Sequence, residues 1–276
     1  THDKFGRGVF LIMFGLVKEA IISDYISVNF VDRIFDNPML YSGFENLMGV
    51  YGYALQIYCD FSGYSDMAIG IALLLGFRFP KNFDAPYKSA TITEFWRRWH
   101  ISLSTWLKDY LYISLGGNRR GRLRTYLNLI ITMLLGGLWH GAALRFVLWG
   151  GFHGVLLALH KLMMGVFPRM KAVGTGMKRG WRIAGIVVTF NLVCLGWIFF
   201  RARDVSTGLE IIEQVFTNLD WSLVPSIITG YWEIFVIMLA GYVAHFMPQR
   251  VQDRACAAVT RNPIVVNALL MALIIW

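Results

Sequence analysis

Two histidines stand out because each lies where an ionisable side chain is unusual. His100 follows a tryptophan in a segment rich in tryptophan and arginine, and His140 ends an apolar run, within the sequence GGLWHG at 136–141. An ionisable group inside a membrane span is costly and usually functional. An imidazole has an ordinary pKa of about 6.5, so it can accept and return a proton near neutral pH. Both histidines are therefore candidates for general acid–base chemistry.

Each histidine also has a purely structural interpretation. His100 fits a core histidine bonded to a backbone carbonyl. His140 fits a hydrogen-bonded residue at a close helix contact, because the small residues Gly136 and Gly137 share its face. His153, in a later apolar run, is expected to pack near His140. The sequence pattern alone leaves the structural and the catalytic interpretations open.

Two carboxylates, Asp60 and Asp66, interrupt a long apolar run. They should not face lipid. We expect them to break the helix, to cap a half-helix, or to pair with Arg97 or Arg98, and a catalytic acid pair is the less favoured alternative. The chain has no GxSxG, HExxH or Walker sequence, and the histidines lack cysteines or acids at ligand spacing, so no metal site is predicted.

The composition indicates that these residues are positioned by helices in a lipid bilayer. Hydrophobic residues make up 56% of the chain and charged residues 16%, against about 45–50% and about 25% in a typical soluble domain. The net charge of +9 comes from Lys and Arg in short loops between apolar runs. This distribution follows the positive-inside rule and argues against a nucleic-acid partner.

Several apolar runs approach the length of about 20 residues that a helix needs to cross a bilayer. They are 5–23, 47–77, 126–143, 146–167, 183–200, 231–247 and a last run that begins near residue 264. The loops between them alternate between acidic and basic, so the basic loops are expected on the cytoplasmic side. The pattern predicts an all-α, polytopic, multi-pass transmembrane protein.

The chain shows no internal repeat and no flexible linker, which predicts a single membrane domain over residues 1–276. It starts at Thr1 and ends inside an apolar run at Trp276. We therefore expect a fragment that is truncated at both ends.

The segment 94–114 is predicted to form one amphipathic helix in the interface, or one that re-enters the protein from the cytoplasmic side. Its apolar residues recur at helical spacing, and Thr93-Glu94 supplies a start. At 100° per residue, His100 falls on the apolar face. The basic turn GGNRRG at 116–121 follows it; it suits the phosphates of a nucleotide-like donor, although an ordinary cytoplasmic loop explains it as well.

Four stretches together resemble a known family. They are YCDFSGYSDMAIG at 58–70, GFRFPKNF at 76–83, FWRRWHISLSTWLKDYLY at 95–112 and GLWHG at 137–141. The chain resembles the membrane-bound O-acyltransferases, in the branch that acetylates alginate, over about residues 3–203. The resemblance implies a ring of helices around a funnel through the membrane. It also implies that His140 is the catalytic residue and His100 the second functional residue.

The resemblance further implies the reaction. The acyl donor is expected to be cytoplasmic acetyl-coenzyme A, used as a substrate without a tightly bound cofactor, and we expect Trp96, Lys108, Asn118 and Arg119 to contact it. The acetyl group would reach a secreted polysaccharide through a periplasmic or extracellular acetyltransferase partner of the SGNH type. The expected location is the bacterial inner membrane.

Three other functions compete with this prediction. One is D-alanyl transfer from a carrier protein to a cell-wall polymer, by the same fold. A transporter with a midplane site at Asp60, Asp66 and His140 is disfavoured because no repeated half is present. A structural subunit that has lost activity is disfavoured because both family histidines are present.

Overall fold

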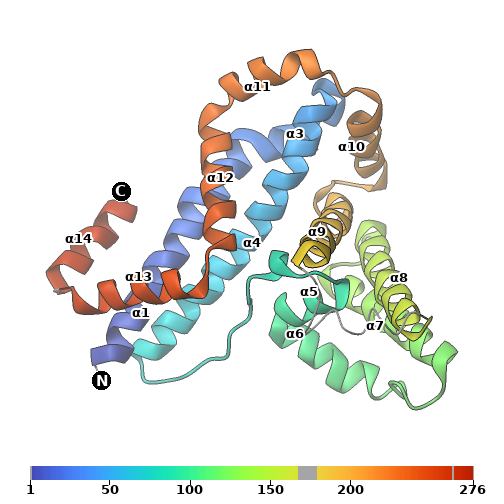
Figure 1. The fold of residues 1–276 in the computed structure, drawn as a ribbon, viewed down its shortest axis with the longest axis horizontal. Coiled ribbons are helices and arrows are strands. Elements are labelled where there is room, and N and C mark those ends of the chain that lie inside the picture. Colours follow the sequence, from blue (N-terminus) through green and yellow to red (C-terminus); the bar gives the residue numbers. More distant parts are fainter. Residues whose placement is uncertain (1, 167–178, 263, 276) are drawn as a thin grey trace. The chain divides into compact units, whose positions relative to one another are not determined.

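The computed structural model describes residues 2–166, 179–262 and 264–275, and in this part of the chain the regular structure is entirely helical (Figure 1). The prediction of an all-α protein is confirmed. Contacts group the chain into two compact units. Unit 1 comprises Thr1–Asn82 and Gln214–Trp276, and unit 2 comprises Phe83–Glu213. The single membrane domain stays a prediction.

Unit 1 begins with a long helical segment and a second helix that packs against it. The first segment is α1 (His2–Leu16), followed by π-helical turns at Val17–Ser23 and Ser27–Val31 that enclose α2 (Asp24–Ile26), and then α3 (Asp32–Asp36). The second helix is α4 (Gly43–Leu74), which starts at a capping box between Ser42 and Glu45. The C-terminal elements are α11 (Val224–Gly230), α12 (Trp232–Phe246), α13 (Gln249–Arg261) and α14 (Ile264–Ile275).

Glycines bring α1 and α4 into backbone contact. A Cβ on Gly15 would lie 2.6 Å from the carbonyl oxygen of Gly63, and a Cβ on Gly8 would lie 2.9 Å from that of Gly70. The two pairs are each seven residues apart on their helices, so they lie on one seam. Small residues at such a seam allow the close helix packing found in membrane proteins.

Close packing lets Lys18 reach the polar residues of α4. Its ammonium Nζ lies 2.6 Å from Asp66 Oδ2 and donates to Ser62 Oγ at 3.1 Å, and Lys18 is only 6% exposed. The expectation that the acids break the helix or cap a half-helix is wrong, because α4 is uninterrupted from Gly43 to Leu74. Asp66 pairs with Lys18, and a pairing of Asp60 with Arg97 or Arg98 stays a prediction. A buried charge is costly unless it is paired. The lysine in the first apolar run and the carboxylate in the second are therefore tolerated because each neutralises the other.

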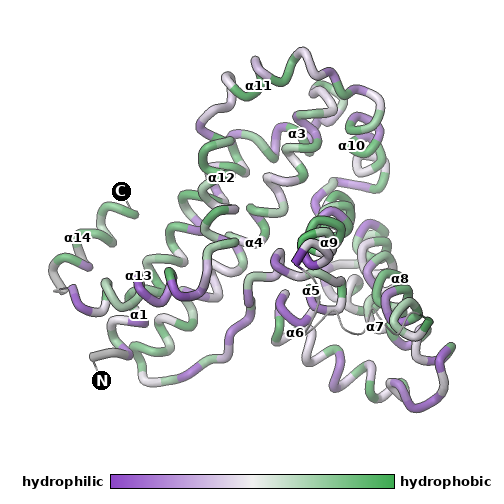
Figure 2. Tube along the Cα trace, viewed as in Figure 1, coloured by the Kyte–Doolittle hydropathy of each residue, from purple (hydrophilic) through white to green (hydrophobic). Residues whose placement is uncertain are grey.

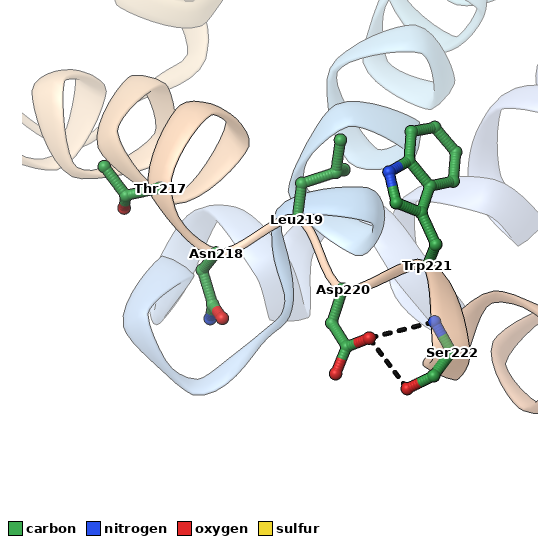
Figure 3. Close-up of a pocket in the computed structure, with 6 residues that line it drawn as sticks. All are labelled: Thr217, Asn218, Leu219, Asp220, Trp221 and Ser222. Carbon is green, nitrogen blue, oxygen red and sulfur yellow. Dashed lines mark hydrogen bonds between the residues drawn. The ribbon is translucent and has the colours of Figure 1, made fainter.

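The C-terminal part of unit 1 contains a bent pair of helices. α11, with the 3₁₀ turn Trp221–Leu223 before it, meets α12 at 88°. An open hollow at 217–222 precedes the turn, where the Asp220 carboxylate accepts from the backbone N–H and the hydroxyl of Ser222 (Figure 3). These hydrogen bonds cap the turn. The polar groups of Asp220 that line the hollow therefore have a structural role in the turn.

Unit 2 contains both candidate histidines. Its helices are α5 (Ile92–Arg98), α6 (Ile101–Trp106), α7 (Arg122–His140), α8 (Leu144–Val166) and α9 (Arg179–Arg201), and α10 (Val205–Thr217) begins in it. α7 and α8 form a hairpin in which glycines face each other: a Cβ on Gly137 would lie 3.2 Å from the Cα of Gly150. The small residues beside His140 therefore serve a close helix contact, as their spacing predicted.

Length and composition allow α8 and α9 each to cross a membrane, and the bent pair α11–α12 passes the same test when taken together. Long hydrophobic stretches mark these helices in Figure 2. A helix also stands at each of the other predicted apolar runs. Those additional crossings stay predictions.

Candidate active site

The segment that carries His100 is broken at that residue. α5 begins at Ile92, where the Thr91 hydroxyl accepts the N–H of Glu94 at 3.1 Å, and ends at Arg98. His100 then has a φ of 42°, and a new helix starts at Ile101. The prediction of one continuous helix over 94–114, starting at Thr93, is therefore wrong. A left-handed residue interrupts the hydrogen-bonding pattern, so a face assigned at 100° per residue does not carry across it.

His100 is held among aromatic rings. It is 9% exposed, its ring stacks on Phe83 with centroids 6.5 Å apart, and it meets Trp139 at 6.1 Å. The hydroxyl of Ser104 donates to the Trp99 carbonyl at 3.1 Å, a hydrogen bond that spans the break. The backbone conformation, and not a helical face, sets the direction of the imidazole.

His140 is the last residue of α7. Gly141 follows it with a φ of 152°, a conformation that L side chains rarely adopt, and ends the helix. The half-buried imidazole is surrounded by rings from α8 and α9: Trp149 lies at 5.2 Å, Phe200 at 5.0 Å and Phe146 at 6.3 Å between centroids. Rings on these sides shield a proton-transferring group from bulk water.

Trp139 connects the two histidines. Its ring lies 6.1 Å from that of His100 and 4.9 Å from that of His140. The structure therefore brings together the two residues that were predicted to be catalytic, although they come from a helix break and a helix end 40 positions apart in the chain. Two imidazoles at one tryptophan can provide a base and a second polar group at a single reacting centre.

His153 and Trp96 support this arrangement. The indole Nε1 of Trp96 donates to Nδ1 of His153 at 3.3 Å. Since an indole only donates, Nδ1 must be the accepting nitrogen of His153. His153 is fully buried and contacts Trp149 at 5.0 Å, and Trp149 in turn contacts His140. The bond thus ties α5, which leads to His100, to the hairpin that carries His140.

The chain after His100 runs along α7 from its end toward its start. A Cβ on Gly136 would lie 3.1 Å from Leu107, which begins the π-helical segment Leu107–Tyr112. Farther on, the Asn128 amide donates to the carbonyls of Leu115 and Gly117 at 3.2 and 3.0 Å. The predicted donor-binding turn therefore lies at the start of α7.

The predicted donor residues fall into two places. Trp96 lies in the aromatic cluster, whereas Lys108, Asn118 and Arg119 are exposed on the later segment. Asn118 Oδ1 accepts from Lys161 Nζ at 2.6 Å, and Lys108 Nζ lies 3.7 Å from Asp109. α7 has 19 residues, so at 1.5 Å per residue the turn and His140 are about 28 Å apart. The turn cannot contact the atoms that react at His140.

Comparison with known proteins identifies the family. The model of the MBOAT, membrane-bound O-acyltransferase family matches residues 2–205, a range that includes both histidines and the whole aromatic cluster. The chain belongs to the membrane-bound O-acyltransferase family. The resemblance predicted from the four sequence stretches is confirmed.

Named relatives of this membrane-bound O-acyltransferase handle different acyl groups. A Pseudomonas fluorescens protein described as "Probable alginate O-acetylase AlgI" is 47% identical over 81% of this chain and 43% of its own length. A Helicobacter pylori peptidoglycan O-acetyltransferase is 41% identical over 77% of this chain and 39% of its own. A Bacillus subtilis teichoic acid D-alanyltransferase is 29% identical over 73% and 52%. The chain thus spans less than half the length of the acetylating relatives it matches.

Sequence reasoning missed the rings around His140. Phe146, Trp149 and Phe200 come from two helices that follow α7, and their contacts depend on how those helices pack. The density of aromatic residues near the ends of apolar runs was the available signal, but it suits an interfacial belt equally well.

Proposed function

We propose that this chain is the catalytic part of a membrane-bound O-acyltransferase that transfers an acetyl group from cytoplasmic acetyl-coenzyme A toward a polysaccharide outside the cell membrane. The observation that carries the proposal is that the rings of His100 and His140 both contact the ring of Trp139. His100 is 9% exposed and His140 is half-buried beside rings from α8 and α9, which suits proton transfer partly shielded from bulk water.

His140 acts as the general base in this proposal. Its imidazole takes the proton of the acceptor hydroxyl as the hydroxyl oxygen attacks the thioester carbonyl carbon. The tetrahedral intermediate then breaks its carbon–sulfur bond, and the thiolate leaves with the proton that His140 returns. His100, which contacts the other side of this arrangement through the ring of Trp139, orients the donor or the acceptor.

The donor enters from the end of α7 that carries the basic turn. Asn118, Arg119 and the neighbouring Lys161 offer polar and cationic groups to the phosphates of coenzyme A. This end lies about 28 Å from His140, which is farther than an extended pantetheine arm reaches. The turn is therefore proposed as the first contact of coenzyme A, and the donor must move along α7 before its thioester reaches the histidines, where Trp96 and Trp139 lie. The phosphate site and the reacting site are therefore separate.

The acceptor side is proposed from the relatives' activities and from charge. Relatives acetylate alginate or peptidoglycan, so the final acceptor is a polysaccharide or cell-wall polymer, reached through an acetyltransferase partner of the SGNH type. The positive-inside rule supports a donor end in the cytoplasm, and with it a multi-pass protein of the inner membrane.

The test uses the full-length parent protein in proteoliposomes with radiolabelled acetyl-coenzyme A. We expect release of free thiol and transfer of label, both abolished in His140→Ala at an unchanged yield of folded protein. Full activity of that variant would refute the mechanism.

The D-alanyltransferase relative supplies a defined competitor. Suppose that acetyl-coenzyme A gives no thiol release but a D-alanyl-loaded carrier protein does. The proposed donor is then wrong, and the proposed acyl transfer is retained with the carrier protein as donor. Failure of both donors would favour a transporter.

A further inference from the structure

Two tryptophans in the cluster around His140 bury an N–H group that has no partner. Trp149 and Trp197 are 2% and 1% exposed, and among the described residues neither indole Nε1 has a hydrogen-bond acceptor. A buried polar group without a partner destabilises the fold. Where such a group lies beside a candidate catalytic residue, an acceptor from outside the chain can complete it.

The two indoles differ in their relation to His140. The Trp149 ring lies 5.2 Å from the His140 ring at an interplanar angle of 89°. Trp197 stacks on the far part of the cluster, 5.9 Å from Trp149 and 4.9 Å from Trp99. In the described part of the chain no ring contact joins Trp197 to His140. Only Trp149 is therefore adjacent to the proposed base.

A third unpartnered nitrogen nearby is already enclosed by the chain. His153 Nε2 is buried, and a Cβ on Gly196 would lie 2.8 Å from it. This nitrogen thus faces the backbone of α9, where no substrate group fits. Of the three unpartnered nitrogens, the indole nitrogen of Trp149 is therefore the one that can donate to a substrate at His140.

We propose that the indole N–H of Trp149 donates a hydrogen bond to the carbonyl oxygen of the acyl thioester at His140. An indole N–H can only donate, so its ligand must be an acceptor such as this oxygen. As the acceptor hydroxyl attacks, negative charge develops on the same oxygen, and the bond strengthens in the transition state. Collapse of the intermediate returns the electron pair to the carbonyl and expels the thiolate.

This inference rests on the proposed acyl transfer and identifies one of its catalytic groups. A donor held in place by the packing of its ring needs little reorganisation during the reaction, which is the property that makes such donors effective. Among the described residues the indole nitrogen of Trp149 has no hydrogen-bond partner, so the substrate does not compete with one.

The experiment replaces the N–H and keeps the ring. In the full-length protein, Trp149 is changed to 3-benzothienylalanine, in which sulfur stands in place of the indole N–H, and separately to Phe. We expect kcat for thiol release from acetyl-coenzyme A to fall about 100-fold in both variants, with little change in KM.

The matched control is Trp197, which has the same burial and the same unpartnered nitrogen. Trp197→Phe and its benzothienyl counterpart should retain kcat within a few-fold of wild type. If the Trp149 variants keep wild-type kcat, or if the Trp197 variants lose as much, the inference is wrong.

The outcome for the proposed function is separate. Wild-type protein that releases thiol, with His140→Ala inactive, upholds acyl transfer whatever Trp149 does. Wild-type protein that releases no thiol from either acetyl-coenzyme A or a loaded carrier would overturn both proposals, since there would be no acyl oxygen for Trp149 to bind.

Discussion

At the scale of single residues, His100 combines a functional side chain with a strained backbone. Its φ of 42° costs a non-glycine residue about 1–2 kcal/mol, which glycine does not incur. Such outliers persist where the surrounding structure enforces them and are frequent at active sites. The Phe83 and Trp139 rings that flank the imidazole are part of that enforcement.

The strain predicts an inverted order of stability for two substitutions. His100→Ala and His100→Gly both remove the imidazole and should both be inactive. Only glycine adopts a positive φ without strain. We therefore expect the free energy of unfolding of His100→Gly to exceed that of His100→Ala by about 1 kcal/mol, and its unfolding temperature to be higher, despite the greater backbone freedom of glycine in the unfolded chain. Thermal unfolding in detergent measures this. A more stable alanine variant would show that the left-handed backbone is absent in the protein.

The two histidines could be chosen as candidates from residue type and from the family resemblance, but their surroundings could not be predicted. Trp139 adjoins His140 in the chain, so its contact with that ring follows from the sequence. Its contact with His100 does not, because it depends on a break in the helix that no glycine or proline announces. Phe200 reaches His140 only through the packing of α9.

At the scale of elements, a buried ion pair joins the π-helical turns after α1 to α4. Lys18 is nearly inaccessible, and its partner Asp66 has a side chain that is 23% exposed. In the sequence, each of the two apolar runs contains a charged residue that does not suit a membrane span. The sequence of neither run indicates that the two charged side chains form a pair. The pairing therefore had to come from the structure.

Breaking this ion pair should destabilise the packing of the first helical segment against α4. Asp66→Asn leaves the ammonium of Lys18 buried without a counter-charge, at a cost of about 3–5 kcal/mol. The double variant Lys18→Met/Asp66→Asn removes that charge and should recover most of the loss. Unfolding in detergent compares the three proteins. Equal stability of the single variant and wild type would mean that Lys18 reaches solvent.

Glu94 fastens α5 to its neighbours and gives this element a pH dependence. Burial alone raises the pKa of the carboxyl, but the N–H of Ala90 at 2.9 Å and the guanidinium groups of Arg182 at 3.1 Å and Arg98 at 3.0 Å outweigh burial and lower the pKa below its ordinary value of 4.5. A carboxyl with a lowered folded pKa stabilises the fold above its ordinary pKa. This contribution is lost as the pH falls through the folded value.

Removing the carboxylate should remove that dependence. Glu94→Gln is expected to be less stable than wild type at pH 7, and the difference should shrink as the pH falls below 4.5. The thermal midpoint in detergent, measured at pH 7 and at successive lower values, provides the test. A difference that is independent of pH would assign the role of Glu94 to packing alone.

At the scale of the whole molecule, the sequence predicted helical class, membrane character and family, because these follow from composition and from contiguous motifs. It did not predict that the described contacts form two compact units. Unit 1 joins residues 1–82 to residues 214–276, and no local pattern in Thr1–Asn82 refers to a segment so far along the chain. The two stretches that carry the candidate histidines, 95–112 and 137–141, both fall within unit 2.

The length of α7 gives the last prediction its physical basis. Its 19 residues cover about 28 Å, close to the roughly 30 Å of a bilayer core. The prediction that α7 crosses the membrane therefore puts the basic turn before Arg122 and the histidine at its end at opposite faces. If the positive-inside rule holds, His140 works near the outer face, and acetyl groups cross the membrane within the protein.

This arrangement can be tested by the sidedness of two cysteines in the full-length protein. Arg120→Cys lies in the exposed basic turn, and Arg203→Cys replaces a side chain that is 77% exposed just beyond α9. Cys256 is changed to Ser in both, since Cys59 and Cys194 are buried. We expect an impermeant maleimide to label position 203 in intact cells and position 120 only after the membrane is opened. Labelling of both positions from one side would place the donor turn and His140 on the same face, and the acetyl group would then have no membrane to cross.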